Sequence, residues 1–237
     1  MTTELTLLLL SAASIGFVHT LLGPDHYVPF VAMARAGEWT KAKTLVVTVA
    51  CGIGHVLGSV ALGLIGIALG WAVGGMETVE SFRGDWAAWA LIAIGLVYGV
   101  WGIRRGLANR PHRHRHLHAD GVVHDHDHMH HREHAHVHAE PAKASLSPWV
   151  LFVIFVLGPC EALIPLLMVP AAFHSWWGLA MVVSIFGVVT VATMTTITFA
   201  LLYGLNLLPL GQLERWSHAL AGFALFACGG AIRWLGF

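Results

Sequence analysis

The sequence predicts an all-α integral membrane protein with six transmembrane helices in two inverted three-helix repeats. Its 237 residues are 57% hydrophobic and only 11% charged, with a mean hydropathy of +0.70. Soluble domains carry about 25% charged residues, so this composition indicates a chain that lies in lipid. The formal net charge is zero with histidine neutral. We therefore expect the lipid bilayer, and no nucleic acid, as a partner.

Six apolar runs are long enough to cross a bilayer core, which needs about 20 helical residues. The sequence divides into a first three-helix repeat (1–105), a His-rich loop that we expect to be disordered (106–146) and a second three-helix repeat (147–237). Acidic residues between the second and third runs predict a loop there that contains Glu77, Glu80 and Asp85. The predicted spans cover residues 4–34, 43–74, 86–105, 147–173, 176–205 and 214–236.

A repeated motif relates the two halves. The first span contains Leu-Gly-Pro-Asp-His-Tyr-Val-Pro at residues 22–29, and the fourth contains Leu-Gly-Pro-Cys-Glu-Ala-Leu-Ile-Pro at residues 157–165. Because proline interrupts helices, helices one and four are predicted to be broken at these Leu-Gly-Pro motifs. Three spans per half place the halves in opposite orientations. Paired interrupted helices in inverted repeats mark the substrate site of many secondary transporters.

The first motif carries His19, Asp25 and His26 inside an apolar run. In an unbroken helix the two histidines would be about 10 Å apart, too far to share an ion. A break at Gly23-Pro24 can bring them together. Imidazole and carboxylate groups suit divalent nickel, cobalt, zinc or iron, so we predict a metal site here.

Three further residues are candidates for the same site. His55 lies in the middle of the second span, either as another ligand or as a partner that orients Asp25. Cys160 and Glu161 occupy the corresponding positions of the second motif. A carboxylate at this depth needs a cation or a proton as partner.

The loop is rich in potential ligands. Its composition is too polar for a packed core, and His-rich tracts are typical of metal binding. We expect it to capture metal through twelve histidines: His112, His114, His116, His118, His124, His126, His128, His130, His131, His134, His136 and His138.

Lysine and arginine are distributed unequally between the two sides. Eleven of the 13 fall in the loops after spans one, three and five, and only Arg83 and Arg233 fall on the other side. We expect a multi-pass protein of the cell inner (plasma) membrane, and the positive-inside rule predicts the orientation of its loops. The His-rich loop would be cytoplasmic, and both termini would be outside.

With these features the chain resembles the nickel/cobalt transporter superfamily, in its urease-accessory-like and nickel/cobalt efflux branches. The resemblance rests on His19…Asp25-His26, on His55, on the paired Leu-Gly-Pro motifs and on the central His-rich loop. It implies transport of a divalent metal, nickel or cobalt first. The family motif has four residues between its first His and Asp-His, whereas this chain has five. The resemblance therefore assigns a site role to Asp25 and His26 more firmly than to His19.

Together these observations predict a proton-coupled transporter, not an enzyme, and export because the loop would gather metal inside the cell. The sequence leaves open whether the chain forms a homo-oligomer. One alternative is a membrane metalloenzyme that uses the same His/Asp/Glu cluster. Another is an exporter of sulfite or another anion, against which we note that the candidate site is acidic and that the predicted spans contain no central Lys or Arg.

Metal capture by the loop should depend on pH because neutral imidazole is the ligand. We expect purified protein to hold several ions per chain at neutral pH and to lose most of them below about pH 6.5. Protein without residues 112–138 should hold only the ion of the intramembrane site. Elemental analysis measures both, and equal metal content in the two proteins would remove the loop from metal capture.

Overall fold

Helices formed by the apolar runs make up most of the chain. The computed structural model describes residues 3–70, 73–108, 112–117, 123–128, 148–158, 160, 162–172, 175–207 and 215–235. In chain order the elements are α1 (Thr3–Leu22), the 3-10 turn η1 (Pro24–His26), α2 (Val28–Ala36), α3 (Lys41–Ala68), α4 (Val73–Ala108), β1 (His112–Leu117), β2 (Val123–His128), α5 (Pro148–Leu157), α6 (Leu163–Ala172), α7 (Trp176–Leu207) and α8 (Ser217–Leu235).

Within the described residues, five helices are long and apolar enough to cross a membrane, a set compatible with a multi-pass membrane protein. The predicted fourth span is divided between α5 and α6, which have 10 residues each. Each of these two helices is shorter than a bilayer core. The five long segments are Thr3–Leu22, Lys41–Ala68, Gly74–Leu107, Trp176–Leu205 and Ser217–Leu235.

The residues between α1 and α2 explain why the helix is interrupted there. Pro24 has no N–H to continue the helix, and the last hydrogen bond of α1 runs from the Gly23 N–H to the His19 carbonyl at 3.0 Å. In the 3-10 turn that follows, the His26 N–H donates to the Gly23 carbonyl at 3.1 Å. Helix α2 then begins with Pro29 in its first turn, where a missing donor costs nothing.

A second interruption separates α5 from α6. Helix α5 ends at Leu157, and α6 begins at Leu163, whose N–H donates to the Cys160 carbonyl at 3.0 Å. Pro159 and Glu161 lie outside the described residues. Because a helix leaves its last carbonyls without intrahelical partners, the end of α5 offers acceptors to side chains of neighbouring helices.

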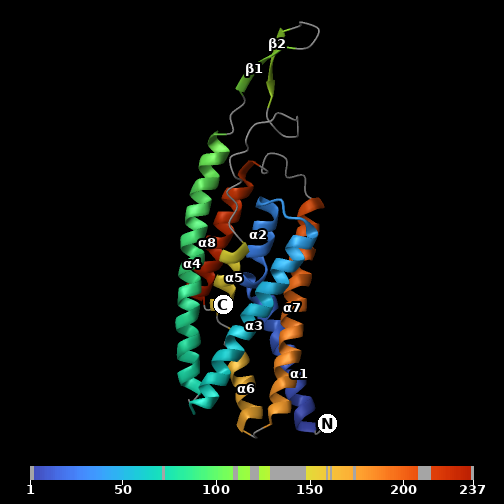
Figure 1. Ribbon diagram of the computed structural model, residues 1–237, viewed down its shortest axis with the longest axis vertical. Helices are drawn as coiled ribbons and strands as arrows, with labels where there is room; N and C mark the ends of the chain where they lie inside the picture. The colour runs from blue at the N-terminus through green and yellow to red at the C-terminus, as the bar shows by residue number, and fades with distance from the viewer. Residues whose placement is uncertain are drawn as a thin grey trace.

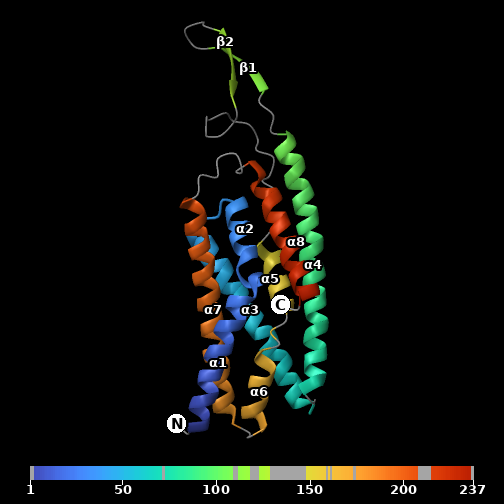
Figure 2. The same ribbon diagram turned by 180° about the vertical axis from the view of Figure 1, so that it is seen from behind.

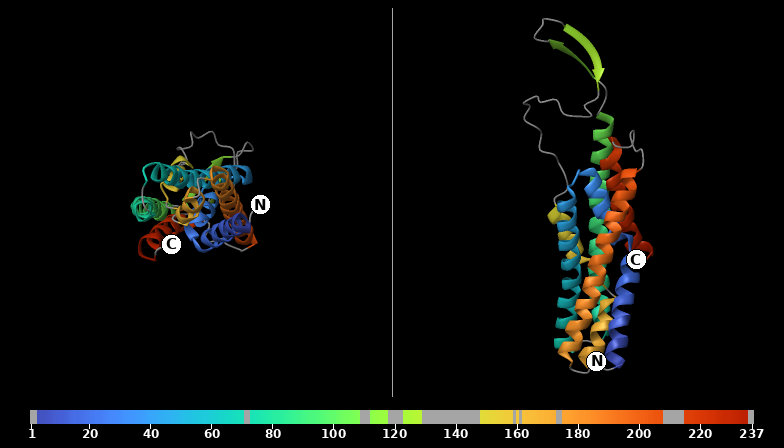
Figure 3. Two further views of the ribbon diagram at one scale, coloured as in Figure 1. Left: turned by 90° about the horizontal axis from the view of Figure 1, so that it is seen from below. Right: turned by 90° about the vertical axis from the view of Figure 1, so that its right-hand side faces the viewer.

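Helices that are distant in sequence lie side by side along the molecule. Helix α4 contacts α8, α1 contacts α7, and α3 contacts both α5 and α7 (Figures 1 and 2). Seen from below, they form one bundle (Figure 3). The N-terminus lies at the end opposite to β1 and β2, and α8 runs from the end nearer the strands toward the other end (Figure 1). Apolar side chains between these helices form two buried clusters.

Helix α4 begins earlier than the predicted third span. Glu77, Glu80 and Asp85 all belong to α4, so the prediction of an acidic loop at these residues is wrong. Arg83, which was expected in the same loop, falls inside the candidate span Gly74–Leu107, so its expected position outside the spans is wrong. Arg83 and Glu80 can occupy this apolar helix because they neutralise each other, with Arg83 Nη1 donating to Glu80 Oε1 at 2.8 Å.

Part of the His-rich loop forms two short strands. Within the segment expected to be disordered, β1 and β2 pair in antiparallel register, with His112 opposite His128, and His116 opposite His124. The remaining predicted capture residues lie outside the described residues: His118, His130, His131, His134, His136 and His138.

Glycines allow α4 and α8 to approach closely. A Cβ atom on Gly222 would overlap the backbone of Gly99 and lie 2.8 Å from the Gly95 carbonyl oxygen. Small residues permit such contacts between membrane helices, where packing takes the place of a hydrophobic driving force.

Gly222→Val should therefore destabilise the bundle by about 1–3 kcal/mol, the usual effect of overpacking. The measurement is the midpoint of thermal unfolding in detergent. Gly204→Val on α7 is the matched control, because no atom of the described part of the chain lies within 4 Å of a Cβ built on Gly204. Equal losses in the two variants would contradict the close α4–α8 contact.

Candidate metal centre

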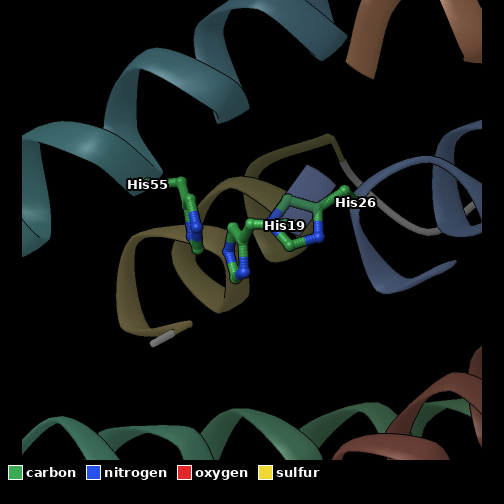
Figure 4. Close-up of side chains that lie close together, drawn as sticks. All are labelled: His19, His26 and His55. Carbon is green, nitrogen blue, oxygen red and sulfur yellow. The ribbon is translucent and has the colours of Figure 1, made fainter. Parts of the chain in front are cut away.

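Three histidines meet inside the bundle. His19 lies in the last turn of α1, His26 in η1 and His55 in the middle of α3 (Figure 4). One ligand nitrogen from each lies within 4.8 Å of the others, and we call these residues the histidine cluster. His26 and His55 are 2% and 3% exposed. Nitrogens that share one ion at about 2.1 Å lie at most about 4.2 Å apart, so small ring movements suffice to close the site.

The interruption after α1 brings the first two histidines together. An unbroken helix would hold His19 and His26 about 10 Å apart. Instead their ring centroids are 4.8 Å apart, and the His26 and His55 centroids are 5.2 Å apart. The Gly23-Pro24 break therefore turns two distant positions on one helix into neighbours.

Backbone carbonyls select the tautomers of two of these rings. His55 Nδ1 donates to the Phe155 carbonyl of α5 at 3.1 Å. His26 Nδ1 lies 3.2 Å from the Gly23 carbonyl oxygen and 3.3 Å from Asp25 Oδ1. Because both kinds of oxygen only accept, each neutral ring carries its proton on Nδ1 and its lone pair on Nε2. A bond of this kind is the usual support for a metal-binding imidazole.

The Nε2 atoms of His19, His26 and His55 are all buried and have no hydrogen-bond partner among the described residues. A buried polar atom left without a partner costs about 1–3 kcal/mol. Three such atoms in one place are explained together if they bind one positively charged ligand. The donor set, three imidazoles, fits a divalent transition metal.

The other predicted site residues lie in three different situations. Asp25 is next to the cluster, with its buried Oδ1 facing His26 Nδ1 and making no hydrogen bond within the described residues. Cys160 is fully buried in an apolar cluster with side chains such as Leu9 and Leu163, and is not among the grouped metal ligands. Glu161 lies outside the described residues.

Gly23 leaves room for the side chains of His26 and Asp25. A Cβ atom there would lie 2.6 Å from His26 Nδ1 and 2.9 Å from Asp25 Oδ1. The backbone of Gly23 is extended, with φ −86°, so the requirement for glycine is one of space and not of conformation.

A separate cavity of about 550 Å³ lies between α3 and α7. Its lining is apolar apart from hydroxyl groups such as those of Ser184 and Thr195. None of the three histidines lines it, so this cavity is not part of the histidine cluster.

The sequence interpretation missed the Phe155 carbonyl and the ion pair between Glu80 and Arg83. The partner of His55 is the backbone of Phe155, 100 positions away, and no side-chain pattern reports a backbone acceptor. Glu80 and Arg83 were placed in a loop, although their i, i+3 spacing is the spacing of an ion pair on one helix face.

Gly23→Ala should weaken binding of Co²⁺ to the buried site by about tenfold or more, because the added methyl group displaces the His26 ring; tenfold corresponds to about 1.4 kcal/mol. Equilibrium titration of protein lacking residues 112–138 measures this site without the loop. Gly187→Ala is the control, since its Cβ would meet only Val56 Cγ1 at 3.4 Å. Unchanged affinity in Gly23→Ala would argue against His26 as a ligand.

Comparison of the chain with protein-family models, with curated proteins and with solved structures gives no match.

Proposed function

We propose that this chain transports a divalent transition-metal cation across a membrane and binds it at the histidine cluster, with Asp25 alongside. The observation that carries this proposal is the convergence of three histidines in an apolar bundle, each with a buried Nε2 atom that has no partner among the described residues. Ionisable groups at such depth are expensive and typically belong to a substrate path. The metal is thus the cargo and not a resident cofactor.

The donor types narrow the cargo. Three neutral imidazoles are borderline donors that suit nickel, cobalt, zinc or iron better than magnesium or calcium, which prefer oxygen. The resemblance to nickel/cobalt transporters favours nickel or cobalt among these metals.

A six-pass topology with two inverted repeats is part of the proposal. In it, α1, η1 and α2 form one interrupted pass, and α5 and α6 form another. Exchanging the halves maps the pair α1–α7 onto the pair α5–α3, and both pairs are in contact. The same exchange maps the contacts α3–α7 and α4–α8 onto themselves. This pattern supports a twofold relation between the halves, as expected for a secondary transporter.

The site would lie near the middle of the membrane. His55 is close to the centre of the 28-residue helix α3, which places it about 20 Å from either helix end. An ion at this depth is accessible from one side at a time if the halves rock about it.

The charged residues indicate the orientation of the protein in the membrane, and the side on which the His-rich loop lies indicates the direction of transport. The C-terminal ends of α2 and α4 and the N-terminal end of α3 lie toward β1 and β2 (Figure 1). Arg35 and Arg105 belong to the last turns of α2 and α4, and Lys41 begins α3, which supports a cytoplasmic position for that end in the inner membrane. A His-rich loop on the cytoplasmic side would gather metal for export. Both termini would then lie outside.

Protons are the proposed counter-ion. Three neutral imidazoles and one carboxylate carry a net charge of −1, and a bound divalent cation changes it to +1. Metal binding to imidazole competes with protonation, so protons entering from the outside would release the cargo.

Asp25→Asn should reduce metal flux in proteoliposomes to the level of protein-free vesicles, because it removes the negative charge beside the cluster while keeping the shape of the side chain. Initial rates of Ni²⁺ or Co²⁺ uptake under a proton gradient are the measurement. Asp85→Asn is a matched control, since Asp85 is half exposed and pairs with Arg233 at 3.7 Å on the bundle surface.

Two results would count against this function. Normal flux in Asp25→Asn would remove the carboxylate from the mechanism. A metal that resists exchange during dialysis against a chelator, together with turnover of a substrate, would favour a membrane metalloenzyme instead.

A further inference from the structure

A buried ion pair lies beside the interruption between α5 and α6. Glu80 and Arg83 occupy successive turns of α4, and their side chains are 0% and 17% exposed. Arg83 Nη1 donates to Glu80 Oε1 at 2.8 Å. Withdrawing two charges from water is unfavourable even when they pair, so this pair needs a reason beyond packing.

The second arm of the guanidinium reaches the end of α5. Arg83 Nη2 donates to the Val156 carbonyl at 2.7 Å. The adjacent carbonyl, that of Phe155, accepts the hydrogen bond from His55 Nδ1 at 3.1 Å. Two consecutive carbonyls in the last turn of α5 are thus held by side chains from α4 and from α3.

Helix α3 leaves room for this arrangement one turn after His55. A Cβ atom on Gly58 would lie 2.8 Å from the Val156 carbonyl oxygen and 3.0 Å from Arg83 Nη2. The glycine therefore allows α3 to lie directly against the hydrogen bond between Arg83 and Val156.

From these contacts we propose that Arg83, aligned by Glu80, is a positioning residue for His55. Arg83 fixes the carbonyl end of α5, and the Phe155 carbonyl then holds the His55 ring so that Nε2 is free for the ion. The inference rests on the proposed function, because it concerns a ligand of that site. Loss of a partner that orients a metal-binding histidine lowers metal affinity by about 10- to 100-fold.

Three variants test the arrangement in the full-length chain. Arg83→Lys keeps the charge opposite Glu80 but loses the fork that reaches two acceptors. The double variant Glu80→Gln/Arg83→Gln leaves no unpaired charge. Gly58→Ala keeps both charged residues and intrudes only on the hydrogen bond to Val156.

The probe is Co²⁺, followed by its visible d–d spectrum during titration. Subtracting the titration of His55→Ala from that of each protein removes the ions held by the His-rich loop. We expect each of the three variants to bind Co²⁺ about 10- to 100-fold more weakly at the buried site and to show an altered difference spectrum. Asp85→Asn, on the same helix, should match the wild type in both readouts.

The outcomes separate this inference from the function on which it rests. Variants that lower only the unfolding temperature, with the affinity and difference spectrum of the wild type, would overturn the positioning role and leave the metal site standing. If the wild type and His55→Ala titrate identically, the proposed site itself is wrong, and the positioning role fails with it. A variant that does not fold is judged by the other two, since each perturbs the contact differently.

Discussion

The arrangement of this protein depends on where its helices stop. In apolar surroundings a backbone carbonyl without a helical partner must be satisfied by another group. The Gly23 carbonyl at the first interruption accepts from the His26 ring as well as from the His26 N–H. The Phe155 carbonyl at the second accepts from the His55 ring as well as from the Gly158 N–H. Each break therefore orients an imidazole, and the two breaks, which are distant in sequence, act on one site. Pro24, which cannot continue α1, is therefore as important to the site as the histidines.

Helix α3 links the packing of the bundle to the geometry of the histidine cluster. This helix carries His55 and presents glycines to its neighbours, and a Cβ atom on Gly54 would lie 2.8 Å from Val156 Cγ2 of α5. A Cβ atom on Gly63 would contact Leu167 of α6 at 2.5 Å. Because α3 lies this close to both short helices, movement of α3 is coupled to both of them, and a shift of α5 would move the acceptor of His55. Such coupling is what a transporter that moves one half against the other would need.

Much of this could be predicted from local chemistry, and the remainder depends on tertiary neighbours. The apolar runs predicted long helices, and the Gly23-Pro24 sequence indicated how His19 and His26 come close enough to share an ion. The start of α4 was misplaced because Glu80 and Arg83 lower the local hydropathy, although each neutralises the other in the folded chain. That Phe155 supports His55 could not be predicted, because hydropathy does not report which helices are neighbours.

The position of Arg83 bears on the choice between a cation and an anion as cargo. An arginine inside an apolar helix is what an anion exporter would use, and the sequence alone gave no such residue. In the structure, however, its two terminal nitrogens donate to Glu80 and to the Val156 carbonyl, so the charge is already neutralised. In the histidine cluster and Asp25, the atoms that lack partners among the described residues are three imidazole nitrogens and one carboxylate oxygen. Lone pairs attract cations and repel anions, so the proposal of a metal as cargo rests on which groups are unpaired and not on which residues are present.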